Sequence, residues 1–115
     1  MPSPALPRHL VVYATAEGKE PLVTWLAGLD ASVSRRIRSR IDRMSLGNFS
    51  DHKGVGEGVE ELRTHFGSGY RVYYAQDGNT IVVLLCGGDK RSQRQDIRLA
   101  QAYWRDYQQQ KESEK

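Results

Sequence analysis

The chain lacks most of the residues from which a cofactor site or a covalent cross-link is built. It has one cysteine, so no internal disulfide can form, and its three histidines show no metal-ligand spacing. Cys86 lies inside an apolar run, which is typical of a small buried core residue rather than a nucleophile. No phosphate-cradling P-loop is present either. We therefore expect no cofactor and no metal.

Long apolar runs are also missing. No segment approaches the ~20 apolar residues that span a bilayer, and the start, MPSPALPRHL, lacks the apolar run of a signal peptide. These absences predict a cytoplasmic location without membrane contact. Neither sign of charge dominates, since 17 Lys and Arg stand against 14 Asp and Glu. A net charge of +3 favours a polyanion only weakly, so the positions of the charges matter more than their sum.

The apolar pattern predicts a single α+β domain, residues 1–115, with the order β-α-α-β-β-β-α. Strands are expected at residues 10–15, 59–64, 70–75 and 81–86, and helices at 17–29, 30–46 and 92–108. The run at 81–86 is apolar throughout, as in a strand that is buried on both faces. We expect a small, mostly antiparallel sheet with helices packed on one face, an open opposite face, and flexible ends at 1–7 and 109–115.

The second helix is predicted to have an apolar and a basic face. Its apolar stripe is Val33, Ile37, Ile41 and Met44, at helical spacing. Its other positions carry five arginines, namely Arg35, Arg36, Arg38, Arg40 and Arg43. A solvated surface explains this pattern, and so does contact with ribosomal RNA or an acidic partner.

Cations also lie along the strands and at the exit of the last one. Because side chains alternate along a strand, Arg71 and Tyr73 point to the face opposite Val72. We assign Val72 to the face that the helices cover, so Arg71 is expected on the open face. Arg63 lies close to it if the two strands pair as a hairpin. The remaining candidates follow the last strand or come from flanking loops, and they are Lys90, Arg91, Lys53 and His65. Converging Arg and Lys side chains can clamp a phosphate, so RNA is the first partner to consider.

Metal-free RNA cleavage needs a base for the 2′-hydroxyl, cations for the charged transition state, and an acid for the leaving 5′-oxygen. His65 has a suitable pKa for the proton transfers, but His52 is equally available. Glu60 or Glu61 is a further candidate base, and an ion pair with a neighbouring arginine is the structural alternative for Glu61. We predict that Arg71, Lys90, Arg63 and His65 are catalytic, and that RNA is contacted by Arg91, Lys53 and Tyr73.

The string ELRTHFGSGYRVYYAQDGNTIVVLLCGGDKRSQRQDI resembles the C-terminal half of RelE/HigB-type toxins. It is most similar to the branch called addiction module killer proteins, or phage Gp49-like proteins. The pieces that carry this likeness are residues 61–63, 69–74, 85–90, Gln93 and 96–97, while Trp25-Leu26 and the arginine-rich helix agree more loosely.

The resemblance implies the toxin of a bacterial toxin–antitoxin pair that cuts messenger RNA in the ribosomal A site without a metal. It implies a helix-turn-helix antitoxin as partner, with operator DNA bound only through the toxin–antitoxin complex. By position, Arg71 matches the strand arginine that contacts the scissile phosphate, and Lys90 and Arg91 match a cation after the last strand.

The chain departs from the family pattern at two places. The strand before Arg71 reads VEELR and lacks the lysines of well-known RelE-type enzymes, and Asp96 and Ile97 stand near the position of their C-terminal tyrosine. Two other functions therefore stay open. One is non-enzymatic inhibition of DNA gyrase, as in the related ParE toxins, and the other is a phage-derived binding module without activity.

Overall fold

The structure, a computed structural model, describes residues 7–49 and 51–114. Its strands are β1 (His9–Val12), β2 (His52–Gly54), β3 (Val59–Arg63), β4 (Arg71–Asp77) and β5 (Ile81–Gly88). Its helices are α1 (Pro21–Ala27), α2 (Ala31–Met44) and α3 (Gln93–Ser113), with a short 3-10 turn, η1 (Lys90–Ser92), before α3. The α+β class and the predicted element order are confirmed, with β2 as an additional short strand in a stretch expected to be a loop.

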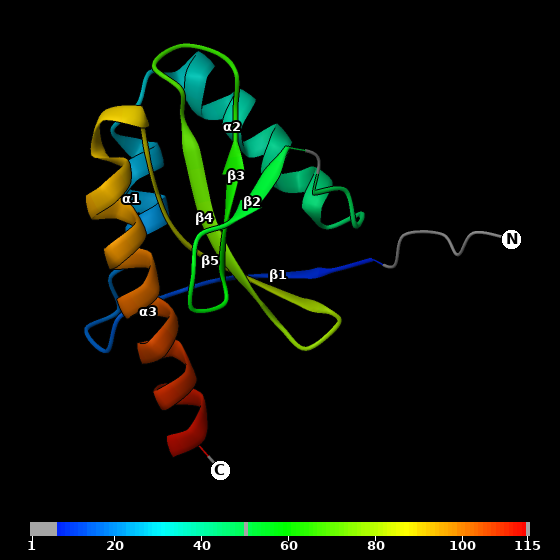
Figure 1. Cartoon of the computed structure of the whole chain (residues 1–115), viewed down its shortest axis with the longest axis vertical. Helices are drawn as coiled ribbons and strands as arrows, with labels where there is room; N and C mark the ends of the chain where they lie inside the picture. Colours follow the sequence, from blue (N-terminus) through cyan, green and yellow to red (C-terminus); the bar gives the residue numbers. More distant parts are fainter. Residues whose placement is uncertain (1–6, 50, 115) are drawn as a thin grey trace, which may run out of the picture.

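One five-stranded sheet organises the molecule, in the order β1-β5-β4-β3-β2 (Figure 1). β1 runs parallel to β5, with His9 opposite Ile81, and the other three pairings are antiparallel. The predicted β3–β4 hairpin is present, and its register places Arg63 directly opposite Arg71. The mostly antiparallel sheet predicted from the sequence is therefore confirmed.

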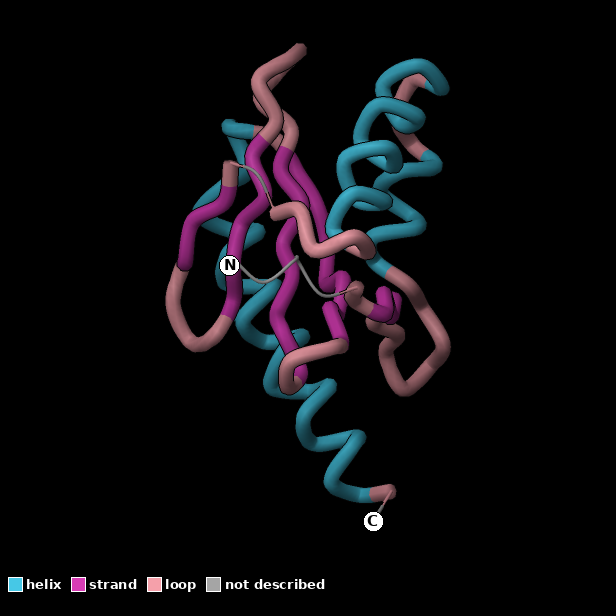
Figure 2. The backbone as a smooth tube through the Cα atoms, turned by 90° about the vertical axis from the view of Figure 1, so that its right-hand side faces the viewer, coloured by secondary structure: helices cyan, strands magenta, loops and turns pink. Residues whose placement is uncertain are grey.

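Helices cover both faces of this sheet, so the prediction of helices on one face only is wrong (Figure 2). Val72 and Tyr74 of β4 pack with α1 and α2, whereas Tyr73 and Ala75 of the same strand pack with α3. Adjacent side chains of a strand point to opposite faces, so the apolar side chains of β5 contribute to both hydrophobic cores. Cys86 lies in the core under α3, where burial raises the pKa of its thiol to about 12, as expected of a core residue.

The last helix is longer than its sequence pattern suggested. α3 continues to Ser113, so residues 109–113, which lie beyond the predicted end of the helix, are helical. Two contacts explain this: the Gln110 side chain donates to the Ala14 carbonyl at 3.2 Å, and Lys111 pairs with Asp77. The other end predicted to be flexible, residues 1–7, lies outside the described residues except for Pro7. In the part of the chain that is described, no helix has the length and apolar character needed to cross a membrane.

The ends of the elements follow from local sequence. Pro21 opens α1, where its missing N–H would have no partner in any case. Gly78 has a φ of 68° in the tight turn between β4 and β5, a backbone conformation that glycine adopts without strain.

Candidate functional site

The predicted cations gather at the end of the sheet where β3, β4 and β5 meet the 64–70 loop and η1, near the top of Figure 1. Arg63 and Arg71 are opposite each other in the β3–β4 register, so their side chains share one face. Gly69 connects this pair to Lys90, because a Cβ on Gly69 would lie 3.2 Å from Arg71 Nη1 and 3.4 Å from Lys90 Cβ. The structure therefore brings Arg63, Arg71 and Lys90 to one place.

Arg71 does not lie on an open face, because α3 covers this side of the sheet. Its side chain is only 12% exposed, and its Nε lies 3.5 Å from Glu61 Oε2. Its Nη1 donates to the Gly69 carbonyl at 2.7 Å. The ion pair proposed as the structural alternative for Glu61 is thus the observed one. Arg71 is therefore held between the Glu61 carboxylate and the Gly69 carbonyl, with little of its side chain exposed.

Glu61 is a fully buried carboxylate beneath the cations. Gln93, at the start of α3, donates to Glu61 Oε2 at 3.0 Å. Tyr73, directly opposite Glu61 in the register, is fully buried as well, so the predicted RNA contact through Tyr73 is wrong. Burial and the nearby Glu61 carboxylate raise the pKa of Tyr73 well above its usual value. These groups support the site from below and do not form its surface.

His65 and Arg63 share one carboxylate, that of Asp51. Arg63 Nη2 donates to Asp51 Oδ1 at 3.0 Å, and His65 Nε2 contacts Asp51 Oδ2. The hydrogen bond from His65, followed by that from Arg63, lowers the pKa of Asp51, while desolvation opposes the shift. The His65 side chain remains 75% exposed. A histidine held by a carboxylate and open to solvent is suited to proton transfer.

The second histidine considered for catalysis lies elsewhere. His52 is opposite Leu62 in the β2–β3 register, and Leu62 packs with α1 and α2. His52 therefore belongs to the sheet face opposite Arg71, where its Nδ1 lies 3.2 Å from Glu60 Oε1. The fold separates both Glu60 and His52 from the cation cluster, which leaves His65 as the histidine of the site.

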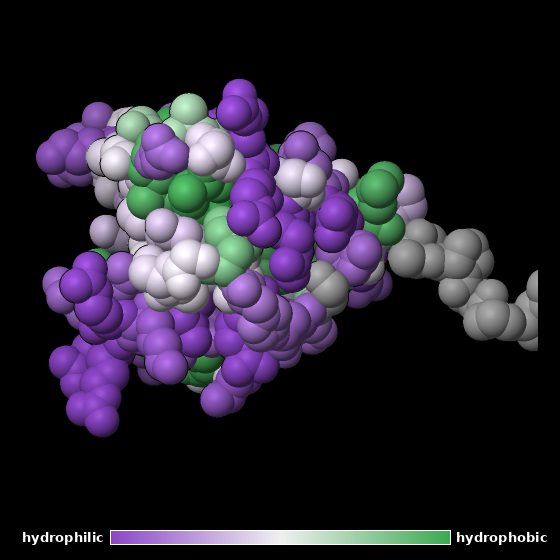
Figure 3. Space-filling model, turned by 90° about the horizontal axis from the view of Figure 1, so that it is seen from above, coloured by the Kyte–Doolittle hydropathy of each residue, from purple (hydrophilic) through white to green (hydrophobic). Residues whose placement is uncertain are grey.

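The remaining predicted RNA contacts, Lys53 and Arg91, lie at the surface on segments next to the cluster. Lys53 is opposite Glu61 on the exposed strand β2, so it shares the face of Arg63 and Arg71. Lys90 is exposed in η1, and the neighbouring Arg91 side chain is 90% exposed, 3.8 Å from Asp89. Figure 3 looks down on this end of the molecule and shows mostly hydrophilic side chains around a smaller hydrophobic area.

Two residues of the site were not predicted from the sequence. Asp51 lies in a polar, glycine-rich loop without periodicity, and no pattern marks it as the partner of His65. Gln93 is among the residues that carry the family resemblance, but its contact with Glu61 depends on how α3 crosses the sheet. No group of three or more His, Cys, Asp or Glu side chains among the described residues is arranged to hold a metal ion.

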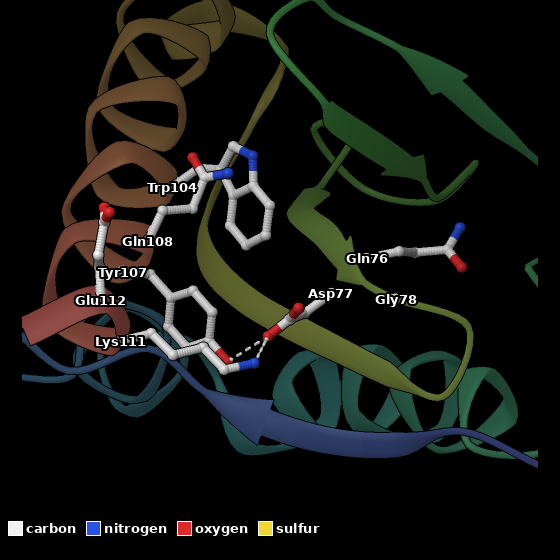
Figure 4. A pocket seen from close by; sticks show the side chains of 8 residues that line it. All are labelled: Gln76, Asp77, Gly78, Trp104, Tyr107, Gln108, Lys111 and Glu112. Carbon is white, nitrogen blue, oxygen red and sulfur yellow. Dashed lines mark hydrogen bonds and ion pairs between the residues drawn. The ribbon is translucent and has the colours of Figure 1, made fainter. Parts of the chain in front are cut away.

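A separate groove lies at the other end of α3 (Figure 4). It has a volume of about 640 Å³ between the C-terminal half of α3 and the β4–β5 turn. Tyr107 donates to Asp77 Oδ2 at 3.0 Å at its base, beside the pair between Asp77 and Lys111. This groove contains none of the predicted site residues, and Asp77, Tyr107 and Lys111 in its lining are already paired with each other.

Comparison with known proteins agrees with the likeness described above. The family model described as "Phage derived protein Gp49-like (DUF891)" matches residues 24–105, which include β2 to β5 and most of the helices. A protein of Haemophilus influenzae, described as an uncharacterized protein, is 45% identical over 78 residues, covering 67% of this chain and 79% of its own length. The family match takes in Arg63, Arg71, Lys90 and the His65–Asp51 pair, so the chain belongs to the phage-derived Gp49-like family.

Proposed function

We propose that the protein is the toxin of a type II toxin–antitoxin module and acts as a ribosome-dependent mRNA endonuclease. Membership of the Gp49-like family, together with the resemblance to RelE/HigB-type toxins, supports this proposal. Its partners are then the ribosome with its messenger RNA and a helix-turn-helix antitoxin that neutralises it. Operator DNA is bound only through the antitoxin complex.

The observation that carries the proposal is the exposed His65–Asp51 pair beside a cluster of cations. In the proposed reaction, neutral His65 takes the proton of the 2′-hydroxyl as the 2′-oxygen attacks phosphorus. Arg63, Arg71 and Lys90 stabilise the extra negative charge on the phosphate oxygens. The P–O5′ bond then breaks, the 5′-oxygen takes a proton from solvent, and a 2′,3′-cyclic phosphate remains.

The proposal is tested by producing the protein in a bacterial host without a neighbouring antitoxin gene and mapping messenger RNA 5′ ends. We expect in-frame cuts within translated regions and growth arrest. His65→Gln should remove the cuts while leaving the circular dichroism spectrum unchanged, because the side chain is largely exposed. Cuts that persist in His65→Gln would remove this histidine from the mechanism.

The contact between Arg71 and Glu61 favours a second candidate function. A buried carboxylate already neutralises the best-placed arginine, and RNA must compete with it for the guanidinium. A protein that blocks DNA gyrase without chemistry has no need for a free Arg71. Growth arrest with intact messages would support this alternative, and the absence of any arrest would support a binding module without activity.

A further inference from the structure

The arginines of α2 form a basic surface that the proposed reaction does not use. The helix contains five arginines and one acidic residue, Asp42. Four of these arginines are exposed, and within residues 7–49 and 51–114 none of the four forms an ion pair with a carboxylate; they are Arg35, Arg36, Arg38 and Arg43. Their charge is therefore available to an external anion.

Part of this surface is hollow. A depression of about 220 Å³ is lined by Arg36, Ser39, Arg40, Arg43 and Phe66. The Arg36 guanidinium stacks over the Phe66 ring, 3.8 Å from its centroid. Stacking fixes the plane of the guanidinium while its N–H edges stay free to donate, which is the geometry that binds phosphate oxygens.

The hollow adjoins the candidate site through the 64–70 loop. Phe66 follows His65 in the chain, and Arg40 Nη2 donates to the backbone carbonyl of Arg63 at 3.4 Å. The same short loop therefore presents His65 on one side and the ring that supports Arg36 on the other. An RNA strand that is bound at His65 can therefore extend its phosphate backbone along the loop to α2.

We propose that this hollow binds a backbone phosphate of the RNA strand, at a nucleotide that flanks the one to be cut. This inference rests on the proposed function, and it assigns the α2 arginines to RNA rather than to an acidic protein. The lining favours RNA because Phe66 is its one apolar side chain, whereas the core of a protein interface is rich in apolar area. Ser39 supplies a hydroxyl that can donate to the same phosphate.

The test measures binding without cleavage. A fluorescent single-stranded RNA oligonucleotide with 2′-O-methyl groups cannot be cut through 2′-oxygen attack, so its affinity is independent of catalysis. Its dissociation constant is measured by anisotropy over a range of salt concentrations for the wild type and for Arg36→Gln/Arg43→Gln. Each lost contact with a single-stranded phosphate lowers the slope of log affinity against log salt by about 0.7, so the double variant, which loses the one phosphate held in the hollow, should lose about 0.7.

Arg98→Gln is the control, because Arg98 is also an exposed arginine and lies on α3, across the sheet from α2. It should keep nearly the full slope, and circular dichroism should show that all variants are folded.

Equal slopes for the α2 and Arg98 variants would overturn the inference, as would a wild type that does not bind the oligonucleotide. Binding of a poly-glutamate peptide at the α2 surface in place of the oligonucleotide would also overturn it, in favour of an acidic protein. Loss of binding in the α2 variant alone supports the inference even if no RNA is ever cut. Cleavage of messenger RNA together with unchanged salt slopes would support the proposed function and contradict the inference about α2.

Discussion

Arg71 and Glu61 lie on neighbouring strands with 3.5 Å between Nε and Oε2, and the carboxylate is fully shielded from solvent. A lone charge at the position of Glu61 is costly, since removal of one partner from a buried pair destabilises a protein by about 3 kcal/mol. Arg71 therefore has a structural task in addition to any contact with a phosphate, and a loss of activity in an Arg71 variant has two possible causes.

Arg71→Ala should lower the free energy of unfolding by about 3 kcal/mol, because Glu61 then remains buried without its cation. Arg71→Ala/Glu61→Gln should recover much of this loss, because the second change removes the negative charge that Arg71→Ala leaves unpaired. Urea denaturation of the wild type, both single variants and the double variant measures the coupling energy of the pair. Additive effects of the two single changes would show that the pair contributes nothing to stability.

Arg71→Lys separates the two tasks of Arg71. A lysine retains the charge beside Glu61 but loses the planar guanidinium that contacts a phosphate with two N–H groups. We expect near-native urea midpoints together with a loss of RNA cleavage of about tenfold or more. If Arg71→Lys cleaves messages at the wild-type rate, bidentate contact with the scissile phosphate is excluded.

The Asp51 carboxylate should make stability depend on pH. Its pKa is lowered in the folded protein, chiefly by the hydrogen bond from His65, so the unfolded chain binds protons more readily as the pH falls. The stabilising contribution is present above the unfolded pKa of about 4 and is lost below it. The drop in the thermal midpoint between pH 6 and pH 3 should therefore be smaller for Asp51→Asn than for the wild type. His65→Ala should give part of the same change, and an unaltered pH response in both variants would contradict the assignment.

Gly87 allows β5 to pack closely against α1. A Cβ at this position would overlap the indole ring of Trp25, which is partly buried against the core and would have to shift. Gly87→Ala should cost about 2 kcal/mol or more in the free energy of unfolding, as overpacked cores do. Gly87→Ala/Trp25→Leu should be more stable than the sum of the two single changes predicts. The sign of this coupling, measured by urea denaturation, decides whether the clash is real.

Glu57 has a φ of 57°, a left-handed conformation that is unfavourable for a residue with a side chain other than Asn or Asp. It also pairs with Arg105 of α3, but both side chains are more than half exposed, so the pair adds little. Glu57→Asn should raise the free energy of unfolding by about 0.5 kcal/mol. Arg105→Gln is the control for loss of the ion pair alone, and destabilisation of equal size in both variants would mean that the pair outweighs the backbone strain.

The sequence predicted four of the five described strands, the three helices and the residues of the cation cluster, because these depend on local periodicity and on hairpin pairing. It did not predict that both faces of the sheet are covered, although the unbroken apolar run of β5 is the pattern expected of a strand buried on both sides. The length of α3 was also missed, because the contacts of Gln110 and Lys111 are with distant residues. For the same reason Asp51, although close to His65 in space, could not be identified as its partner.

The parallel pairing of β1 and β5 has a consequence for how the protein is made. His9 pairs with Ile81, so the first strand has no partner until most of the chain has left the ribosome. Closing so long a loop is slow relative to the formation of the α1–α2 and β3–β4 hairpins. The edge strand therefore completes the sheet late in synthesis, and until then the apolar side chains Leu10 and Val12 are exposed to chaperones and proteases.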